Sequence, residues 1–332
     1  MIDVLLVSLG STAGLRAADD ELAASLRRAG ARVDVARAVA VPDVRTFALT
    51  DFFWARAARA AAIRGLDRGP VGGVIYSTIT AALFWPRPGA IRFDAPAAAN
   101  RPGRHGAWQR PVERVRLGQA PLLIPQSAGA LAEAPAGRTP AVVVPVPVDR
   151  SGRAAGVRDI AAITYGANPH KKGLDRVLAA WRAARRPGEE LVVAGISALP
   201  PDAAGTTGVD GVRVVGMISP EDYRGLLRRS RVYVTAPRRE DYGIAQLEAL
   251  ADGCMLVTNR APGPYVGLEL ADRLDSRLVG DDLAGALRLA LDAPRPDYAG
   301  AAAGLLEPFS RAAVDRVIAG ELLAVLGRPQ SS

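Results

Sequence analysis

The sequence predicts an α/β protein built from two Rossmann-like domains with parallel sheets. With 332 residues, the chain is too long for one ordinary core and suits two α/β domains. Short apolar runs alternate with segments at helical spacing, which is typical of βαβ units. We place the first domain at residues 1–150, the second at 151–308, and a final amphipathic helix within 309–332.

The chain opens with a βαβ unit. An apolar strand at 4–8 runs into a loop that contains Gly10 and Gly14, and a helix follows at 15–29 before a strand at 33–35. The two glycines are four apart without a third, so the loop is not the dinucleotide fingerprint. A tight turn and a ligand-binding loop fit this pattern equally well.

The next helix, at 52–63, begins with the aromatic group Phe52-Phe53-Trp54. Exposed aromatic residues would indicate contact with an acceptor or a membrane, but we favour core packing because aromatic side chains dominate buried area. A strand at 71–76 follows. Another strand, at 90–93, delivers Asp94 to its carboxyl end. The later elements of this domain are a helix at 108–118, a strand at 122–124, a short helix capped by Ser127, and an apolar run at 142–149.

The second domain begins with a strand at 160–165, a loop at 166–173 and a helix at 174–184. A lysine just before a helix N-terminus, such as Lys172, can place a point charge on a diphosphate; the alternative is a solvated surface lysine. Strands at 191–194 and 212–215 come next, before a helix that Ser219 caps. In the turn between them, Met217 and Ile218 suit either an apolar cover for a ligand or the core.

The stretch from Val232 to Thr258 is the most informative part of the chain. A buried strand at 232–235 precedes the charged group 238–241, which must turn out at the carboxyl end of the strand. Gly243 then starts a helix, Gly253 is expected to cap its C-terminus, and a further strand begins at Met255.

Acids and amides at the mouth of this unit suit an anionic ligand that carries hydroxyl groups. The helix N-terminus offers unpaired N–H groups to phosphate, and Gly243 allows close approach to the backbone. Glu240 can accept hydrogen bonds from sugar hydroxyls, and Glu248, about one and a half turns into the helix, can reach a second polyol such as a ribose. The alternative is that Glu240 is a solvated loop acid and Glu248 an exposed helical acid.

These residues resemble the signature of the retaining glycosyltransferases of family 4. The resemblance rests on Glu240-x7-Glu248, with Asp241-Tyr242-Gly243 after the first glutamate and Leu247–Gly253 around the second. It implies the GT-B fold, in which two Rossmann-like domains face a cleft and the final helix crosses back to the first domain. It also implies that Glu240 and the amides after it hold the donor sugar, and that Glu248 binds the ribose.

The resemblance extends to Lys172-Gly173, which implies that Lys172 holds the diphosphate of the donor. The family usually has an arginine soon after the position of Gly166, where this chain has Ala167-Asn168. Either Lys171, Arg238 or Arg239 replaces the missing charge, or the transferase is weak or inactive.

Other positions follow from the same resemblance. The loop from Gly10 to Gly14 would lie at the cleft, and the turn with Met217 and Ile218 would lie against the nucleobase. Asp94 stands where family members often have histidine, or histidine and aspartate, which makes it a candidate catalytic residue with Glu240 and Lys172. The family's common glutamate near Tyr265 is absent.

The function implied is transfer of a hexosyl group from a nucleoside-diphosphate sugar to an acceptor hydroxyl with retention, without an obligatory metal ion. Two alternatives stay open. Ala167-Asn168 would also fit a non-catalytic nucleotide-sugar-binding or scaffold protein. A nicotinamide-dependent oxidoreductase would need the glycine fingerprint that Gly10 to Gly14 does not provide.

Composition narrows the partners and the location. The net charge of +8 could attract nucleotide sugars, an anionic acceptor or an anionic membrane face. The sequence contains no basic run interleaved with aromatic residues, so we do not expect nucleic acid as a partner. The single cysteine, Cys254, excludes an internal disulfide and CxxC metal sites, and we expect it to be a buried structural thiol. Without a signal peptide or an apolar run of about 20 residues, we expect a cytoplasmic protein, with peripheral contact at the inner membrane face as an option.

Overall fold

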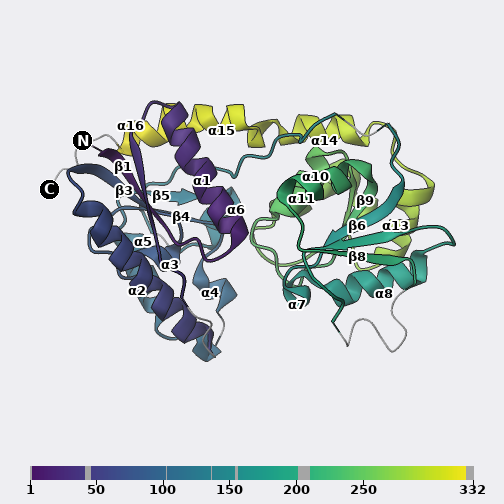
Figure 1. Cartoon of the computed structure of the whole chain (residues 1–332), viewed down its shortest axis with the longest axis horizontal. Helices are drawn as coiled ribbons and strands as arrows, with labels where there is room; N and C mark the ends of the chain where they lie inside the picture. Colours follow the sequence, from purple (N-terminus) through teal and green to yellow (C-terminus); the bar gives the residue numbers. More distant parts are fainter. Residues whose placement is uncertain are drawn as a thin grey trace. The chain divides into compact units, whose positions relative to one another are not determined.

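The computed structural model describes residues 2–41, 46–101, 103–135, 137–153, 156–200 and 210–326. The chain divides into two compact units, each with its own parallel sheet (Figure 1). The first unit combines Met1–Pro147 with Arg311–Ser332, and the second is Val148–Ser310. The C-terminal helical segment therefore belongs to the unit formed by the N-terminal half of the chain.

The first unit is built on a five-stranded sheet in the order β2-β1-β3-β4-β5, and every pairing is parallel. Side chains along the interior strand β1 alternate between the two faces, so that Val4 and Leu6 join one apolar cluster and Leu5 and Val7 join another. A strand covered on both faces reads as a continuous apolar run, which is why this one was evident in the sequence. The strands are β1 (Ile2–Ser8), β2 (Val33–Arg37), β3 (Val71–Tyr76), β4 (Ala90–Phe93) and β5 (Leu123–Pro125).

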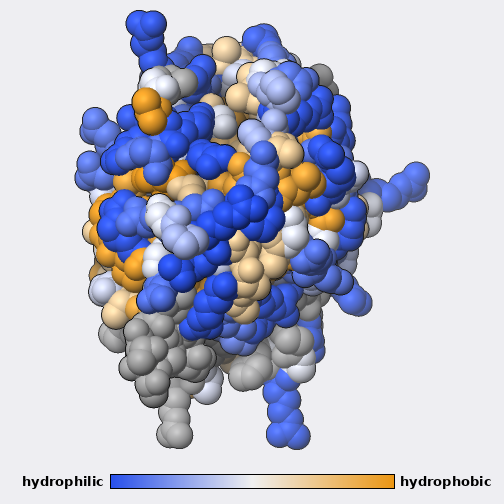
Figure 2. Space-filling model, turned by 90° about the vertical axis from the view of Figure 1, so that its right-hand side faces the viewer, coloured by the Kyte–Doolittle hydropathy of each residue, from blue (hydrophilic) through white to orange (hydrophobic). Residues whose placement is uncertain are grey.

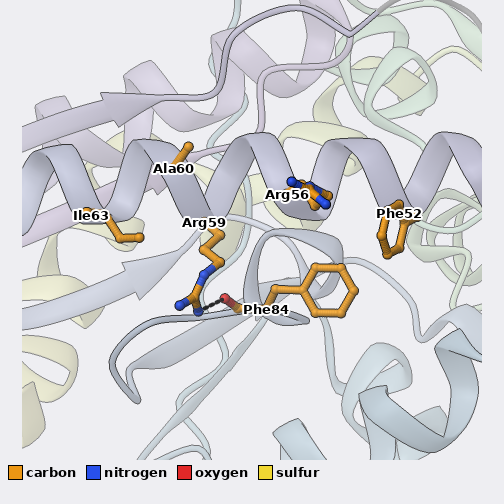
Figure 3. Close-up of a pocket in the computed structure, with 6 residues that line it drawn as sticks. All are labelled: Phe52, Arg56, Arg59, Ala60, Ile63 and Phe84. Atoms are coloured by element: carbon orange, nitrogen blue, oxygen red, sulfur yellow. Dashed lines mark hydrogen bonds between the residues drawn. The ribbon is translucent and has the colours of Figure 1, made fainter.

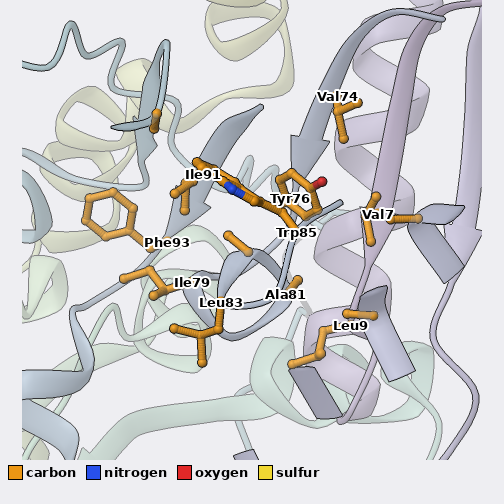
Figure 4. Packing of buried hydrophobic residues seen from close by; sticks show 14 of the residues in the cluster. Val7, Leu9, Val74, Tyr76, Ile79, Ala81, Leu83, Trp85, Ile91 and Phe93 are labelled. Atoms are coloured by element: carbon orange, nitrogen blue, oxygen red, sulfur yellow. The ribbon is translucent and has the colours of Figure 1, made fainter. Parts of the chain in front are cut away.

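Helices cover both faces of this sheet. On one face, α2 (Phe47–Leu66), α3 (Ile79–Ala82) and α5 (Gln109–Gln119) contribute to the cluster that contains Tyr76 and Trp85 (Figure 4). On the other face, α1 (Ala13–Arg28) packs through leucines such as Leu22 and Leu26. The remaining helical segments of the N-terminal part are α4 (Ala97–Asn100), the 3-10 turn η1 (Gly103–Gly106) and α6 (Ala128–Glu133).

The C-terminal segment packs beside α1. It comprises α15 (Arg311–Val317), a π-helical turn η4 (Ile318–Leu322) and α16 (Leu323–Leu326). Val314, Ile318 and Leu322 are buried in the same cluster as the leucines of α1, and Arg28 pairs with Asp315 at 2.7 Å. The apolar periodicity predicted one helix over 311–326. The observed segment keeps that apolar face but changes its winding at Ile318.

The second unit repeats the architecture with the strand order β10-β9-β6-β7-β8, again all parallel. Hydrophilic residues predominate on the face in Figure 2 and surround smaller apolar areas. The strands are β6 (Ile160–Tyr165), β7 (Leu191–Ala194), β8 (Val212–Gly216), β9 (Ser230–Thr235) and β10 (Met255–Thr258). The helical segments are α7 (Pro169–Lys172), α8 (Leu174–Ala184), α10 (Pro220–Arg229), α11 (Ile244–Ala251), α12 (Val266–Asp275), η2 (Ser276–Leu278), α13 (Leu283–Asp292), α14 (Tyr298–Leu306) and η3 (Glu307–Phe309).

The most informative stretch of the sequence folds as β9, α11 and β10. Helix α11 ends in a Schellman motif, in which Gly253 N donates to Leu250 O at 3.0 Å and Cys254 N donates to Ala249 O at 2.8 Å. Gly253 has a positive φ of 83°, which confirms its predicted place at the end of the helix. This compact stop returns the chain directly to β10, which pairs with β9.

Two local predictions for the first unit were wrong. Helix α2 begins at Phe47 instead of Phe52, so the aromatic group lies in its second turn. Trp54 packs against the core as expected, whereas Phe53 is 41% exposed. Between the strand at 90–93 and the helix at 108–118 we predicted no regular element, but the chain there contains α4 and η1. No helix in the described parts of the chain is long and apolar enough to cross a membrane.

Candidate functional site

Two lysines of α7 meet the acidic loop that follows β9. Lys172 Nζ lies 2.6 Å from Glu240 Oε2, and Lys171 Nζ lies 2.6 Å from Asp241 Oδ2. The two partners of each contact are about 70 positions apart in the chain, and the sequence predicted all four residues as site residues. The structure brings them together at the carboxyl ends of β6 and β9, where ligands bind in open α/β sheets.

Backbone contact holds these two loops together. Arg238 N donates to Lys171 O at 3.0 Å. Gly173 has a φ of 64°, and a Cβ at this position would lie only 1.9 Å from the carbonyl oxygen of Ala236. Only glycine allows the junction between α7 and α8 to approach the end of β9 so closely. This approach fixes the position of the lysine that precedes it.

The carboxylate of Glu240 is buried and largely engaged. Besides Lys172, its Oε2 accepts a hydrogen bond from Gln246 Nε2 at 3.1 Å, and its Oε1 accepts one from Asp241 N at 3.3 Å. A carboxylate offers about four lone-pair positions, so these contacts leave roughly one for a ligand hydroxyl. Gln246 is 1% exposed and was not among the predicted site residues. Its position on α11, six residues after Glu240, gave no signal beyond an amide within an apolar helix.

The backbone of Glu240 is fixed from the other side by the loop after β10. Glu240 N donates to Pro262 O at 3.1 Å, and a Cβ on Gly263 would lie 2.2 Å from the carbonyl oxygen of Glu240. Behind this loop, the Tyr265 hydroxyl lies 2.9 Å from Thr258 Oγ1, and burial raises the pKa of the tyrosine. Tyr265 is thus a buried, neutral phenol that supports the loop.

Glu248 belongs to a second charged group. Its carboxylate lies 3.5 Å from Arg224 Nη1, and Arg224 Nε also pairs with the fully buried Asp252 at 2.6 Å. Burial raises the pKa of Glu248 above its usual value, Arg224 lowers it and the charge of Asp252 raises it further. The side chain of Glu248 stays 26% exposed, so a ligand can reach it. Arg224, on α10, was not predicted.

The three residues considered as substitutes for the missing arginine are all paired. Arg238 makes two hydrogen bonds to Asp175, at 2.9 and 2.7 Å. Arg239 Nε lies 3.0 Å from Asp241 Oδ1, so Arg239 shares that carboxylate with Lys171. Arg238 is therefore committed to α8, whereas Arg239 and Lys171 surround the same acid beside Glu240.

The position of the missing arginine has a structural role of its own. Asn168 has a left-handed backbone, with φ 56°, and its side chain accepts a hydrogen bond from Lys171 N at 3.2 Å. It thereby caps the turn that carries both lysines. Gly166, two residues earlier, packs against Val193 and Leu174.

The remaining predicted donor residues differ in what they can offer. The side chain of Tyr242 is 3% exposed, so a ligand cannot reach its ring. Gly243 is the left-handed N-cap of α11. Met217 is 70% exposed after β8, and Ile218 is half-buried.

In the first unit, Gly10, Gly14 and Asp94 lie beside the carboxyl ends of β1 and β4. Gly10 has a positive φ of 58° and its carbonyl accepts a hydrogen bond from Arg16 at 2.7 Å, whereas Gly14 is inside α1. Asp94 is half-buried, and its Oδ1 accepts a hydrogen bond from Ala95 N at 2.9 Å.

A buried ion pair near these residues was missed. Arg92 on β4 lies 3.3 Å from Asp19 on α1, and both are at most 2% exposed. Ser8 Oγ donates to the same aspartate at 2.6 Å. Burial raises the pKa of Asp19, although Arg92 and Ser8 oppose the shift. An arginine inside an apolar strand was the only signal for this pair.

The structure also tests the prediction for the single cysteine. Cys254 is fully buried, its Sγ donates to Leu227 O at 3.1 Å, and burial raises its pKa to about 12, which confirms a buried structural thiol. Within the described ranges of the chain, no group of three or more His, Cys, Asp and Glu residues has an arrangement that could hold a metal ion.

A known family model matches most of the second unit by sequence. Residues 159–289 match the family model of the glycosyl transferases group 1. The matched segment lies within the second unit. This match contains Lys171, Lys172, Glu240, Asp241 and Glu248. No curated protein matches the chain by sequence.

Several solved structures are similar over nearly the whole chain. HepE from Anabaena, in complex with UDP and glucose, has a TM-score of 0.71 and 14% identity, covering 98% of this chain and 100% of that one. WaaG, a glycosyltransferase involved in lipopolysaccharide biosynthesis, has a TM-score of 0.69 and 15% identity, with 96% and 99% covered. Sucrose-phosphate synthase from Thermosynechococcus elongatus has a TM-score of 0.66 and 15% identity, with 98% and 99% covered.

At such low identity, these likenesses concern the fold alone. They confirm the predicted α/β class: the chain has the GT-B fold, with two Rossmann-like units that each contain a parallel sheet.

Proposed function

We propose that this protein is a retaining glycosyltransferase that moves a hexosyl group from a nucleoside-diphosphate sugar to an acceptor hydroxyl. The observation that supports this most strongly is the contact of Lys172 with Glu240 inside the segment that matches the glycosyl transferases group 1. It places a cation for the diphosphate 2.6 Å from an acid suited to sugar hydroxyls. Since an ammonium group has three N–H donors, Lys172 can keep Glu240 and still donate to a phosphate oxygen.

Each group of the donor has a proposed partner. The diphosphate would lie on Lys172, on Arg239 and Lys171, and on the amides at the N-terminus of α11. The sugar would donate a hydroxyl hydrogen bond to Glu240, and the ribose would do so to Glu248. Met217 and Ile218 would cover the base. HepE and the pneumococcal transferase GtfA were each solved with UDP, and by analogy a nucleoside diphosphate is the ligand to test first.

In the proposed reaction, the bond between the anomeric carbon and the terminal phosphate oxygen breaks, and the acceptor oxygen bonds to the same face of that carbon. The acceptor proton passes to the departing phosphate oxygen. Lys172 and the helix terminus stabilise the charge that develops on this phosphate, so no obligatory metal ion is needed. Asp94 remains a candidate for contact with the acceptor.

A non-catalytic nucleotide-sugar-binding protein is the second candidate. Asn168 favours it, because this residue caps α7 where the resembling enzymes have an arginine for the diphosphate. Losing one charge-assisted contact to phosphate costs about 1.5–3 kcal/mol if nothing replaces it. In the structure, Arg239 and Lys171 stand beside Asp241 and are the groups that could replace it.

Slow hydrolysis of the donor tests catalysis without knowledge of the acceptor. The wild-type protein would be incubated with UDP-, GDP-, ADP- and dTDP-sugars, and the anomer first released would be observed by proton NMR. The proposal expects one donor to be hydrolysed with the α-anomer retained, and expects EDTA to leave the rate unchanged. Release of the β-anomer first would overturn retention, and binding without any hydrolysis would favour the non-catalytic alternative.

The matched control is an arginine whose ion pair lies outside the site. Arg186 pairs with Asp292 on the surface of the second unit. Arg186→Ala should keep hydrolysis at the wild-type rate, whereas Lys172→Ala should abolish it. Equal effects of the two substitutions would show that the assay reports stability and not the site.

A further inference from the structure

We propose that the outer face of α2 docks onto the surface of an anionic lipid bilayer. This surface, called the α2 face, consists of side chains at helical spacing along one side of the helix: Leu49, Phe53, Arg56, Ala60, Ile63 and Arg64. All six are exposed. The inference concerns the first unit alone and does not depend on the donor site.

Apolar side chains are concentrated on this face. Leu49 is 49% exposed, Phe53 41% and Ile63 38%, and they are among the few large hydrophobic residues that are exposed in the described chain. Single exposed hydrophobic residues are ordinary, but three on one helix face form a pattern. A helix that carries leucine, isoleucine and phenylalanine between arginines is typical of segments that lie in a membrane interface.

A groove extends this apolar surface. It has a volume of about 400 Å³ and lies between α2 and Phe84, lined by Phe52, Arg56, Arg59, Ala60 and Ile63 (Figure 3). The Arg56 guanidinium lies 5.8 Å from the centre of the Phe52 ring. Arg59 donates to Phe84 O at 2.9 Å, which holds one wall of the groove in place. An apolar floor between cations suits the boundary between headgroups and acyl chains.

Charge is the second, independent observation. Residues 46–119 contain 11 arginines, no lysine and four acidic residues, and so carry +7 of the chain's net charge of +8. Two of these acids, Asp51 and Glu113, are buried beneath the surface, and Asp51 pairs with Arg101. The exposed Asp67 stands at the C-terminal end of α2. The solvent-facing balance is therefore strongly basic.

Several of these arginines have no acidic partner among the residues that the structure describes. Arg56, Arg64 and Arg114 form no ion pair within the described part of the chain, whereas most arginines on the second unit's surface do, such as Arg186 with Asp292. Helix α5, which carries Arg114, packs on the same face of the sheet as α2 and exposes Val115. Such cations on two helices of one sheet face match a broad anionic surface better than one small ligand.

Sedimentation with lipid vesicles tests this proposal on the full-length protein. Vesicles of phosphatidylglycerol and phosphatidylcholine would be compared with vesicles of phosphatidylcholine alone, at two salt concentrations. We expect binding to the anionic vesicles only, and a decrease at the higher salt concentration. R56E/R64E should weaken binding by more than 25-fold, on the basis of about five-fold for each arginine removed.

Matched variants separate this surface from general effects. R182E/R273E makes the same change in charge on helices α8 and α12 of the second unit, and should retain most of the binding. Phe53→Ser should lower binding several-fold, whereas Val157→Ser, at a position 74% exposed, should not. Circular dichroism melting and binding of a nucleoside diphosphate should be unchanged in all of them.

Three outcomes would overturn the proposal. These are equal binding to neutral and anionic vesicles, equal loss in the two double variants, and no loss in either of them. If R56E/R64E still binds anionic vesicles but no longer binds heparin or an acidic protein, the surface binds a polyanion instead of a membrane. Loss of nucleotide binding with vesicle binding intact would contradict the proposed function but leave this surface standing.

Discussion

Lys172 Nζ lies 2.6 Å from Glu240 Oε2, and the two residues come from segments that follow different strands, β6 and β9. The contact provides the buried carboxylate of Glu240 with a counter-charge. Burying that carboxylate without a cation would cost free energy of folding. Because a diphosphate and a sugar hydroxyl are neighbours in a donor molecule, one ligand can contact both partners at once. The contact therefore defines the centre of the proposed site.

Gly173 should be the glycine on which this contact depends most. Gly173→Ala places a Cβ 1.9 Å from Ala236 O and holds alanine at a positive φ, so we expect a loss of stability above 2 kcal/mol and at least tenfold weaker nucleotide binding. Gly188 has a similar φ of 83° with open space around it. Gly188→Ala should cost only about 1–2 kcal/mol and leave binding unchanged. Urea unfolding and calorimetric titration measure both effects.

Glu248→Gln should raise stability at neutral pH while weakening nucleotide binding. Burial raises the folded-state pKa of Glu248 above its unfolded value, so its contribution to stability is complete below the unfolded pKa and is lost as the pH rises through the folded one. Glutamine carries no charge, so the variant does not lose stability in this way. The variant's advantage in melting temperature should therefore be present at pH 8 and disappear near pH 4.

The same substitution should weaken nucleoside diphosphate binding by about 10- to 150-fold if Glu248 binds the ribose, because a hydrogen bond to a charged group is worth about 1.5–3 kcal/mol. A more stable variant that binds as tightly as wild type would remove Glu248 from the site.

Gln246 should act by positioning Glu240. Gln246→Leu removes the 3.1 Å hydrogen bond to Glu240 Oε2 and should lower donor affinity about tenfold, with a stability loss of about 1–3 kcal/mol. Gln109, which is 2% exposed in the first unit, provides the control. Gln109→Leu should change stability without changing donor affinity. If both variants bind the donor equally well, Gln246 is merely structural.

Replacing one member of the buried pair of Arg92 and Asp19 should destabilise the first unit strongly. Arg92→Leu leaves Asp19 buried without its cation and should cost about 3–5 kcal/mol, measured by urea unfolding. Because burial already raises the pKa of Asp19, the cost should be smaller at pH 5 than at pH 8. Asp19→Asn combined with Arg92→Leu should recover part of the loss. No recovery would mean that packing, and not charge, explains the effect.

The sequence predicted most of the fold because its strands are buried on both faces. Val4–Ser8 and Ile160–Tyr165 stand out as apolar runs, and glycine and serine mark the helix ends, as at Gly253 and Ser219. The start of α2 was misplaced by five residues because Thr46, its N-cap, precedes a segment without strong periodicity. Element ends depend on such single hydrogen bonds.

For the site, the sequence identified residues whose chemistry is visible in a motif. Lys172, Glu240 and Asp241 were named and lie together. It did not identify Gln246 or Arg224, because their roles arise from contacts across helices that have no fixed spacing in the chain. The ion pairs of Arg238 and Arg239 could not be assigned in advance either, since adjacent arginines point to different acids.

The most direct test of the account is calorimetric titration of UDP, GDP, ADP and dTDP into wild type, Lys172→Ala and Lys171→Ala. We expect one nucleoside diphosphate to bind the wild-type protein, with affinity reduced about 10- to 150-fold in Lys172→Ala, from the loss of about 1.5–3 kcal/mol. Lys171→Ala should lose less, because Arg239 still contacts Asp241. Equal affinity of wild type and Lys172→Ala for the nucleotide that binds, or no binding by any of the four, would contradict the assignment of this site.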